Sequence, residues 1–178
     1  MYHLLMICGS LRAASSSRAL AEALADRLPA GVTCERADIA SLPHYNADVT
    51  DDAAVAKLIE QIDGADGVLF VTPEYNYSIP GVLKNAIDWA SRPAYASVFK
   101  DKPALVISVS GGALGGVRAQ NHLKYVLNGM LAAVHPCQEV LIMQANAKVT
   151  AGRFADAAAL DVAADTLADF VSRSGARD

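Results

Sequence analysis

Residues 67–90 read GVLFVTPEYNYSIPGVLKNAIDWA and carry the clearest structural signal in the chain. Residues 67–72 form a short apolar run with β-branched side chains, which is typical of a strand buried on both faces of a sheet. From residue 82 onward the apolar residues recur at helical spacing. Pro80 suits a first helical turn, because its missing N–H would have no partner there. A loop therefore joins a buried strand to a helix at this point.

This loop is polar, aromatic and bracketed by two prolines. Because proline restricts φ, we expect the backbone between Pro73 and Pro80 to be stiff and to hold its N–H and C=O groups in place. Tyr75 and Tyr77 offer flat faces, and Asn76 offers both a donor and an acceptor. These features suit the polar rim of a flat heterocycle. A tight surface turn with locally packed tyrosines explains the same spacing, and the spacing alone leaves both interpretations open.

The rest of the chain repeats the order of strand, loop and helix. Buried strands are expected at residues 3–8 and 103–110, and weaker ones at residues 32–39 and 139–143. Helices are expected at residues 17–28, with Ser17 as cap, and at 51–63, 81–91, 117–133 and 154–171. This alternation predicts an α/β sandwich of three layers, a five-stranded parallel sheet with helices on both faces. The natural strand order is the doubly wound 2-1-3-4-5, in one domain spanning residues 1–178.

The composition is that of a globular protein, with 53% hydrophobic and 6% aromatic residues. The formal net charge is −4, and Lys and Arg form no basic stripe, which argues against nucleic acid as a partner. Cys8, Cys34 and Cys137 form no C-x-x-C pair, so we expect free thiols in a reducing compartment. No segment has the length of a membrane span or the features of a signal peptide, which predicts a cytoplasmic protein with no membrane partner.

Three polar loops are expected at one edge of the sheet, because the first, third and fourth strands are neighbours in the order 2-1-3-4-5. The first loop, residues 9–17, contains four serines and one arginine and precedes a helix N-terminus, where free N–H groups attract anions. Phosphate binding is one interpretation, and a serine-rich cap beside a solvated arginine is the other. The loop is neither a Walker A motif nor G-x-G-x-x-G, which weighs against direct dinucleotide binding there.

The loop after the fourth strand, residues 110–116, contains four glycines. Glycine lets a backbone approach a ligand closely, but a flexible connector has the same composition. Elsewhere no pair of residues has the spacing of a catalytic acid and base, and the G-x-S-x-G motif of hydrolases is missing. The four histidines are dispersed, so no metal is expected. A redox cofactor that performs the chemistry itself would explain why no acid–base pair is found.

Three segments together resemble the NAD(P)H-dependent FMN reductases, and within them the bacterial quinone, chromate and azo-dye reductases. The segments are GSLR at residues 9–12 with the serines that follow, PEYNYSIPGVLKNAIDW at residues 73–89, and SGGALGG at residues 110–116. The second block is long and specific, and the other two support it at the expected positions. The resemblance covers about two thirds of the chain, up to the helix after Gly116, and implies a flavodoxin-like fold.

The resemblance implies an FMN site with no catalytic side chain, because N5 of the flavin carries the hydride. It assigns the FMN phosphate to the first loop, the isoalloxazine ring to the second and the other side of the ring to the third. The residues implied are Ser10, Arg12, Ser15, Ser16 and Ser17 for the phosphate, Pro73, Glu74, Tyr75, Asn76 and Tyr77 along the ring, largely through backbone groups, and Ser110 and Gly111 at its other side.

The activity implied is an NAD(P)H oxidoreductase with a ping-pong mechanism. NADPH or NADH would reduce FMN, and a small-molecule acceptor of the quinone, flavin, azo or chromate type would then take two electrons in the same place. The resemblance also implies a homodimer or homotetramer, with Tyr77 and Arg92 contributing to the subunit interface.

Two other functions are compatible with an FMN site. An electron carrier that does not oxidise a nicotinamide is expected to be strongly acidic and to enclose the ring with aromatic residues, whereas this chain has a net charge of only −4 and few aromatic residues. A flavin-dependent sensor or scaffold would need a large exposed apolar patch, which a sequence does not reveal.

Overall fold

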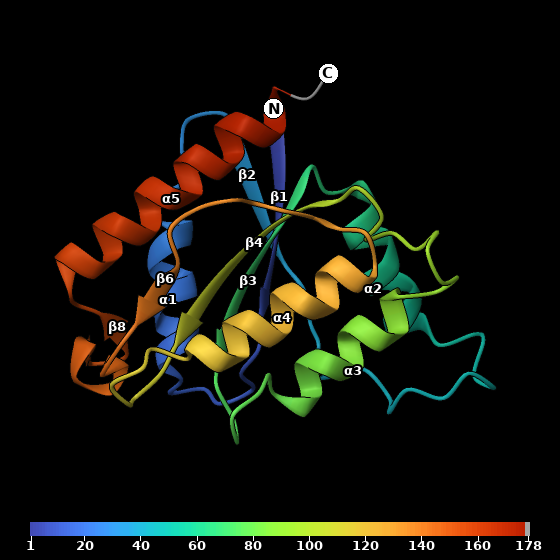
Figure 1. The fold of residues 1–178 in the computed structure, drawn as a ribbon, viewed down its shortest axis with the longest axis horizontal. Coiled ribbons are helices and arrows are strands. Elements are labelled where there is room, and N and C mark those ends of the chain that lie inside the picture. Colours follow the sequence, from blue (N-terminus) through green and yellow to red (C-terminus); the bar gives the residue numbers. More distant parts are fainter. Residues whose placement is uncertain (177–178) are drawn as a thin grey trace.

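A parallel β-sheet runs through the middle of the molecule, with helices on both of its faces (Figure 1). The computed structural model describes residues 1–176. The strand order is β2-β1-β3-β4-β5, and β6 also pairs with β4. The predicted flavodoxin-like α/β sandwich with the order 2-1-3-4-5 is therefore confirmed. The strands of this sheet are β1 (Tyr2–Cys8), β2 (Val32–Arg36), β3 (Gly67–Pro73), β4 (Pro103–Val109), β5 (Ala133–Val134) and β6 (Val140–Ile142).

The three central strands form the core of the sheet. Leu69 of β3 lies between Met6 of β1 and Leu105 of β4, and all three side chains are buried. Their near-continuous apolar sequences follow from this position, because helices cover both faces of a parallel sheet.

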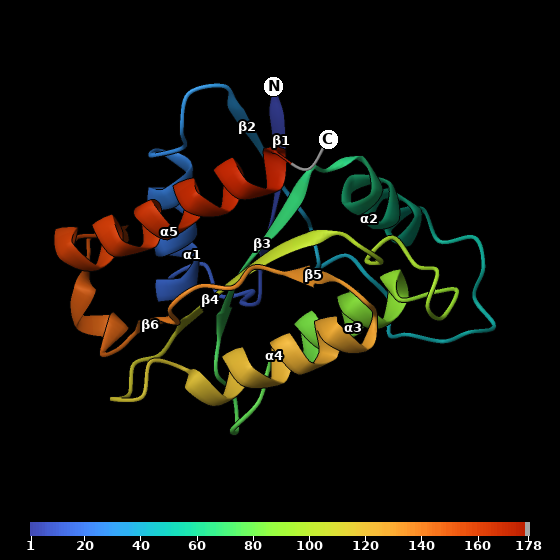
Figure 2. The ribbon, with the colours of Figure 1, turned by 45° about the horizontal axis from the view of Figure 1, so that its top comes forward.

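The helices divide between the two faces (Figure 2). On one face, α1 (Ser16–Ala25) and α5 (Ala157–Gly175) pack on the sheet in one apolar cluster. On the other face, α2 (Ala53–Gly64), α3 (Gly81–Ala90) and α4 (Val117–Gly129) form a second cluster. No helix within residues 1–176 is both long enough and apolar enough to cross a membrane.

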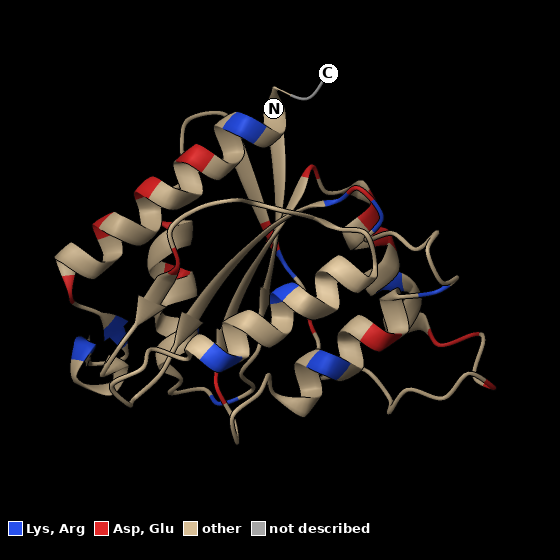
Figure 3. Cartoon of the chain, viewed as in Figure 1, with Lys and Arg blue, Asp and Glu red and all other residues tan. Residues whose placement is uncertain are grey.

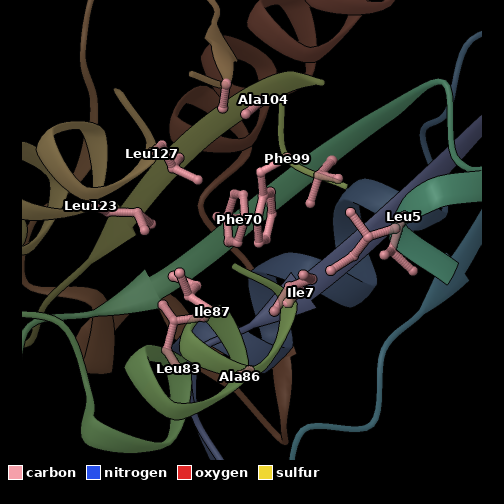
Figure 4. Close-up of a cluster of buried hydrophobic side chains, with 14 of the residues drawn as sticks. Leu5, Ile7, Phe70, Leu83, Ala86, Ile87, Phe99, Ala104, Leu123 and Leu127 are labelled. Atoms are coloured by element: carbon pink, nitrogen blue, oxygen red, sulfur yellow. The ribbon is translucent and has the colours of Figure 1, made fainter. Parts of the chain in front are cut away.

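Phe70 of β3 lies at the centre of the second cluster (Figure 4). Its ring centroid is 6.4 Å from that of Phe99, and Leu83 of α3 and Leu123 of α4 belong to the same cluster. All four side chains are at most 1% exposed. Burying a side chain of this size contributes about 1.5–3 kcal/mol, so this contact between β3 and its helices is a main source of stability.

The fifth position of the sheet is divided between two short strands, whereas a single strand at residues 139–143 was expected. β5 pairs with the start of β4 and β6 with its end. Between them, the buried Gln120 of α4 uses Nε2 to donate to the carbonyl oxygens of Val106, at 2.9 Å, and Val140, at 3.3 Å. A side-chain amide thus replaces the missing strand pairing at Val106.

The expected helix at residues 117–133 ends early for a related reason. α4 stops at Gly129, and Leu131 has a left-handed backbone with φ 63°. The Asp101 N–H then donates to the Leu131 carbonyl, which turns the chain into β5. The predicted helix extended to residue 133 because Leu131 and Ala132 continue the apolar pattern.

α1 also differs from the expected helix at residues 17–28. It begins at Ser16, and the N-cap residue is Ser15, so the prediction of Ser17 as cap was wrong. The side chain of Ser15 makes no capping hydrogen bond. The helix ends at Ala25, where the Arg27 N–H donates to the Leu24 carbonyl in a tightened last turn.

The closing helix begins later than the expected residue 154. Asp156 caps α5 by accepting from the Ala159 N–H at 3.0 Å. Before it, β7 (Val149–Thr150) and β8 (Arg153–Phe154) form a small hairpin that follows the 3₁₀ helix η1 (Ala145–Lys148). The sequence predicts a loop at residues 146–152, whereas the structure has this short 3₁₀ helix and hairpin there.

Candidate functional site

The loops after β1, β3 and β4 lie together at the carboxyl edge of the sheet, at the bottom of the view in Figure 1. The hydroxyl oxygens of Ser10 and Tyr75 lie 3.4 Å apart, which joins the first loop to the second. The third loop is connected to the first through Asn146, whose Oδ1 accepts from the Ser16 hydroxyl at 3.1 Å. Segments more than 100 residues apart in sequence thus meet at one edge.

The first loop leaves β1 at Gly9, which lies against β3. A Cβ atom at Gly9 would stand 2.5 Å from Oγ1 of Thr72, so only glycine allows this close approach. The loop then turns through a hydrogen bond from the Ser15 N–H to the Arg12 carbonyl at 3.2 Å and enters α1. The path of the loop is therefore determined by β3 and by its own turn.

The serines of this loop surround an uncapped helix N-terminus. Ser10, Ser15 and Ser17 are at most 7% exposed, and Ser16 is half-buried. The N-termini of α2, α4 and α5 each receive a carboxylate, whereas no side chain caps α1. Its first N–H groups and the positive end of its dipole are thus available to an anion.

Arg12 is the exposed cation of this loop. Within residues 1–176, its guanidinium forms no hydrogen bond or ion pair with another side chain. An unpaired arginine three residues before the N-cap Ser15 offers charge and a bidentate donor for a phosphate.

The second loop is a tight hairpin at the end of β3. The Tyr75 N–H donates to the Ser78 carbonyl at 3.0 Å, and the Ser78 N–H donates back to Tyr75 at 3.1 Å. Asn76 and Tyr77 between them both have positive φ, 49° and 67°, as in a type I′ turn. Such a paired turn constrains the backbone in addition to the flanking prolines.

Glu74 points its side chain away from the hairpin and into α4. Its Oε2 accepts from the N–H groups of Arg118, at 3.0 Å, and Ala119, at 3.4 Å. Its Oε1 accepts from Nη1 of Arg118 at 3.1 Å. The carboxylate therefore serves as the cap of α4, and only the backbone of Glu74 remains for a ligand.

α4 holds the hairpin through two more side chains. The guanidinium of Arg118 lies 4.4 Å from the centre of the Tyr77 ring, and Nδ1 of His122 lies 3.0 Å from the Ser78 hydroxyl. Arg118 and His122 are one helical turn apart, so both face the hairpin. Neither residue was predicted as part of the site, although the spacing of Arg118 and His122 is visible in the sequence.

The third loop uses most of its glycines for packing within the chain. A Cβ atom at Gly111 would stand 2.7 Å from Nδ2 of Asn146, and one at Gly115 would stand 2.7 Å from Cβ of Leu141. Gly115 and Gly116 also have positive φ, 60° and 84°. Of the four glycines, Gly112 is the least crowded, since a Cβ atom there would stand 3.5 Å from the Ser110 hydroxyl oxygen, an ordinary contact distance.

Ser110 is bonded within the chain through its N–H, its carbonyl and its hydroxyl oxygen. Its N–H donates to the Ile142 carbonyl and its carbonyl accepts from the Ala145 N–H, both at 2.9 Å. Its hydroxyl accepts from the Gly112 N–H at 3.1 Å. These bonds fix the loop against the segment that follows β6.

The second half of the 73–89 block, in α3, contacts a different part of the chain. Asn85 Nδ2 and Trp89 Nε1 both donate to the carbonyl of Pro43, at 2.9 and 2.8 Å. The Tyr45 ring lies edge-on to Trp89, and its hydroxyl accepts from Nε of Arg92. These α3 residues therefore anchor the loop that precedes α2 and lie outside the cluster of three loops.

A cavity of about 160 Å³ lies beside the first loop, between Ser10 and the residues that follow β2. Ligand pockets usually measure roughly 300–1,000 Å³, so this cavity is too small for a cofactor-sized molecule. A cofactor would therefore have to lie outside this cavity.

A model of a protein family described as NADPH-dependent FMN reductase matches residues 2–147 of the chain. The chain belongs to this family. An NAD(P)H-dependent FMN reductase from Pseudomonas aeruginosa is 48% identical over 157 residues, covering 84% of this chain and 83% of that protein. A 2-hydroxy-1,4-benzoquinone reductase from a Burkholderia species is 49% identical over 123 residues, covering 68% of this chain and 67% of that protein.

Solved structures show the same architecture as this member of the FMN reductase family. FerB, a flavoenzyme NAD(P)H:acceptor oxidoreductase from Paracoccus denitrificans, superposes with a TM-score of 0.86 at 35% identity, covering 98% of this chain and 99% of FerB. An azoreductase from Bacillus anthracis superposes with a TM-score of 0.67 at 22% identity, covering 95% of this chain and 100% of that chain, and shares the fold.

The residues of this FMN reductase family member fit the chemistry of FMN. The uncapped α1 terminus and the unpaired Arg12 suit its phosphate group. The exposed hairpin at Tyr75–Tyr77 and the exposed Gly112 suit the edge of its planar ring. The charged residues of the molecule are distributed over several helices (Figure 3). The charge of the first loop comes from Arg12 alone.

Cys8 lies under the first loop of this family member and stays a neutral thiol. Burial raises the pKa of the Cys8 thiol, which outweighs the lowering by a backbone hydrogen bond at Ser10 and by Arg18. Within residues 1–176, no three His, Cys, Asp or Glu side chains gather closely enough to hold a metal ion.

Proposed function

We propose that this protein is an NAD(P)H-driven, FMN-dependent oxidoreductase that reduces quinones. The observation that carries the proposal is the meeting of three loops, from β1, β3 and β4, around one open surface. The names of its relatives support the substrate classes, since they include an NAD(P)H-dependent FMN reductase, a 2-hydroxy-1,4-benzoquinone reductase and an Escherichia coli quinone reductase that is 45% identical over 126 residues.

In this proposal the first loop binds the FMN phosphate. Arg12 supplies the charge, and the serine hydroxyls and the N–H groups of α1 supply the donors. The proposed phosphate ligands are Ser10, Arg12, Ser15, Ser16 and Ser17.

The ring would lie along the hairpin and against the third loop. Pro73, Glu74, Tyr75, Asn76 and Tyr77 would contribute mainly backbone groups, because the Glu74 carboxylate is bonded to α4. Ser110 and Gly111 would border the other side of the ring, with their backbone positions fixed by Ile142 and Asn146. When bound, FMN supplies the two-electron chemistry, and the protein holds the ring in one orientation.

We further propose that the nicotinamide and the acceptor use the same place in turn, which is a ping-pong mechanism. Tyr75 and Tyr77 are 43% and 69% exposed, so one side of the hairpin is open to a second flat molecule in the single chain. A second copy of the chain would narrow this opening. Exposed Tyr77 and Arg92 are proposed to lie at such a dimer or tetramer interface.

A cytoplasmic location is part of the proposal. NAD(P)H is a reductant of that compartment, and all three cysteines are free, as expected where thiols stay reduced.

The deciding experiment mixes purified, FMN-loaded protein with NADPH, and separately with NADH, under nitrogen. The flavin absorbance should bleach within minutes and should return when a benzoquinone is added. A flavin that stays oxidised with both nicotinamides, yet accepts electrons from a protein donor, would support an electron carrier and refute the proposal.

A further inference from the structure

Asn146 lies at the meeting point of the first and third loops, in the 3₁₀ helix η1. Its Oδ1 accepts a hydrogen bond from the Ser16 hydroxyl at 3.1 Å. Its Nδ2 lies so close to Gly111 that a Cβ atom there would stand only 2.7 Å away. The amide therefore touches two residues expected at opposite ends of the FMN site.

The position of Asn146 is fixed by the backbone around it. The Ser110 N–H donates to the Ile142 carbonyl, and the Ala145 N–H returns to the Ser110 carbonyl, both at 2.9 Å. The Gln144 N–H donates to the Gly112 carbonyl at 3.0 Å, with Gln144 in a left-handed conformation at φ 50°. Three hydrogen bonds thus attach this segment to the third loop, and the Asn146 side chain extends the connection to the first.

Ser16 has a single hydroxyl proton, and here it is given to Asn146. A phosphate only accepts hydrogen bonds, so Ser16 could not donate to a phosphate while it donates to Asn146. The Asn146 amide can bond to Ser16 in either way, because it carries both an acceptor oxygen and a donor nitrogen. Rotating the Asn146 amide by half a turn would present Nδ2 to the Ser16 oxygen and release the hydroxyl proton toward the phosphate.

We propose that Asn146 is a positioning residue for the FMN phosphate, which acts through Ser16 by exchanging the acceptor Oδ1 for the donor Nδ2. The inference depends on the proposed FMN site at the first loop. An aspartate at this position would have the same shape but two acceptors, so it would hold the Ser16 proton permanently and place a negative charge beside the phosphate.

The test compares FMN with riboflavin, which has the same ring and no phosphate. Dissociation constants for both flavins are measured by quenching of flavin fluorescence, in the unaltered protein and in Asn146→Asp, Asn146→Ala and the control Asn128→Asp. Asn128 is exposed on α4 and carries the same charge change.

Asn146→Asp should weaken FMN binding about tenfold or more, the usual effect of losing a charged hydrogen bond, and should change riboflavin binding by less than about threefold. Asn146→Ala should have a smaller effect on the FMN-to-riboflavin ratio, because it leaves the Ser16 proton free. Asn128→Asp should leave the ratio unchanged.

An unchanged FMN-to-riboflavin ratio in Asn146→Asp, whether both affinities fall together or neither falls, would overturn the inference. If Asn146→Asp does not fold, Asn146→Ala is combined with Ser16→Ala. The proposal expects the two substitutions to be less than additive in the ratio, and additive effects would refute it. Failure of the unaltered protein to bind FMN would instead refute the proposed function.

Discussion

Oε1 of Glu74, at the end of β3, lies 3.1 Å from Nη1 of Arg118, at the start of α4. The same carboxylate also accepts from two backbone N–H groups of α4. The Glu74 side chain therefore joins the loop that follows β3 to the helix that follows β4, in addition to the contacts of Tyr77 with Arg118 and of Ser78 with His122. Any movement of the hairpin at Tyr75 would have to break this group of hydrogen bonds.

Substituting Glu74 with Ala should lower the free energy of unfolding by about 1–3 kcal/mol, because α4 loses its cap and Arg118 loses its partner. The Glu74 side chain is only 13% exposed, so water replaces these bonds poorly. Urea unfolding measures the change. Glu60→Ala, at an exposed position on α2, is the control. Equal stability of the two variants would show that the Glu74 contacts contribute nothing.

Arg12→Ala should weaken FMN binding by about 1.5–3 kcal/mol, the usual value for a hydrogen bond to a charged group. Its stability should be unchanged, because the guanidinium has no partner within residues 1–176. Titration with FMN and with riboflavin measures the effect, and riboflavin affinity should hardly change. An FMN affinity equal to that of the unaltered protein would remove Arg12 from the phosphate site.

Tyr77→Gly and Tyr77→Val should differ in stability, although both remove the contact with Arg118. Glycine adopts positive φ without strain, so the gain and the lost contact should cancel to within about 1 kcal/mol. Valine is β-branched and poorly tolerated at φ 67°, and it should destabilise the protein by about 1–3 kcal/mol. Thermal and urea unfolding compare the two. A valine variant as stable as the glycine variant would contradict the positive φ of Tyr77.

Stability should depend on Asp156 in acid. The hydrogen bond from Lys148, followed by that from the Ala159 N–H, lowers the pKa of Asp156 below its ordinary value of 3.8. The unfolded chain then takes up this proton at a higher pH than the folded chain. The contribution of Asp156 is therefore complete above about pH 5 and is lost as the pH falls through the lowered pKa.

Unfolding by urea at pH 3, 4, 5 and 7 tests this dependence. Asp156→Asn should be less stable than the unaltered protein at pH 7, and the difference should shrink at pH 3. Asp165→Asn, at an exposed position on the same helix, is the matched control. A difference that is the same at all four values would contradict the role of the ionised carboxylate.

The sheet and its binding edge could be predicted from the sequence because they depend on long apolar runs and on the order of elements. Residues 3–8, 67–72 and 103–109 are apolar because both faces of the strands are covered. Their order then places the three polar loops at one edge, whatever the details of each loop.

The contacts within the site could not be predicted in the same way, because they join residues far apart in the chain. Glu74 looked like a residue of its own loop, yet its partners are on α4. The glycines at positions 111 and 115 looked available to a ligand, yet Asn146 and Leu141 occupy the space beside them. Nothing in the sequence singles out Gln120, yet its amide donates to the Val106 carbonyl of β4.

The interruption between β5 and β6 affects how the protein behaves at high concentration. An outer strand that is long and continuous presents a row of backbone groups to which another polypeptide can add. Here the outer strand is two pieces of 2 and 3 residues, and Gln120 already satisfies the carbonyl between them. This border of the sheet is thus a poor template for fibrous self-association. Replacing Gln120 with an apolar residue should leave the Val106 carbonyl without its partner and make self-association easier.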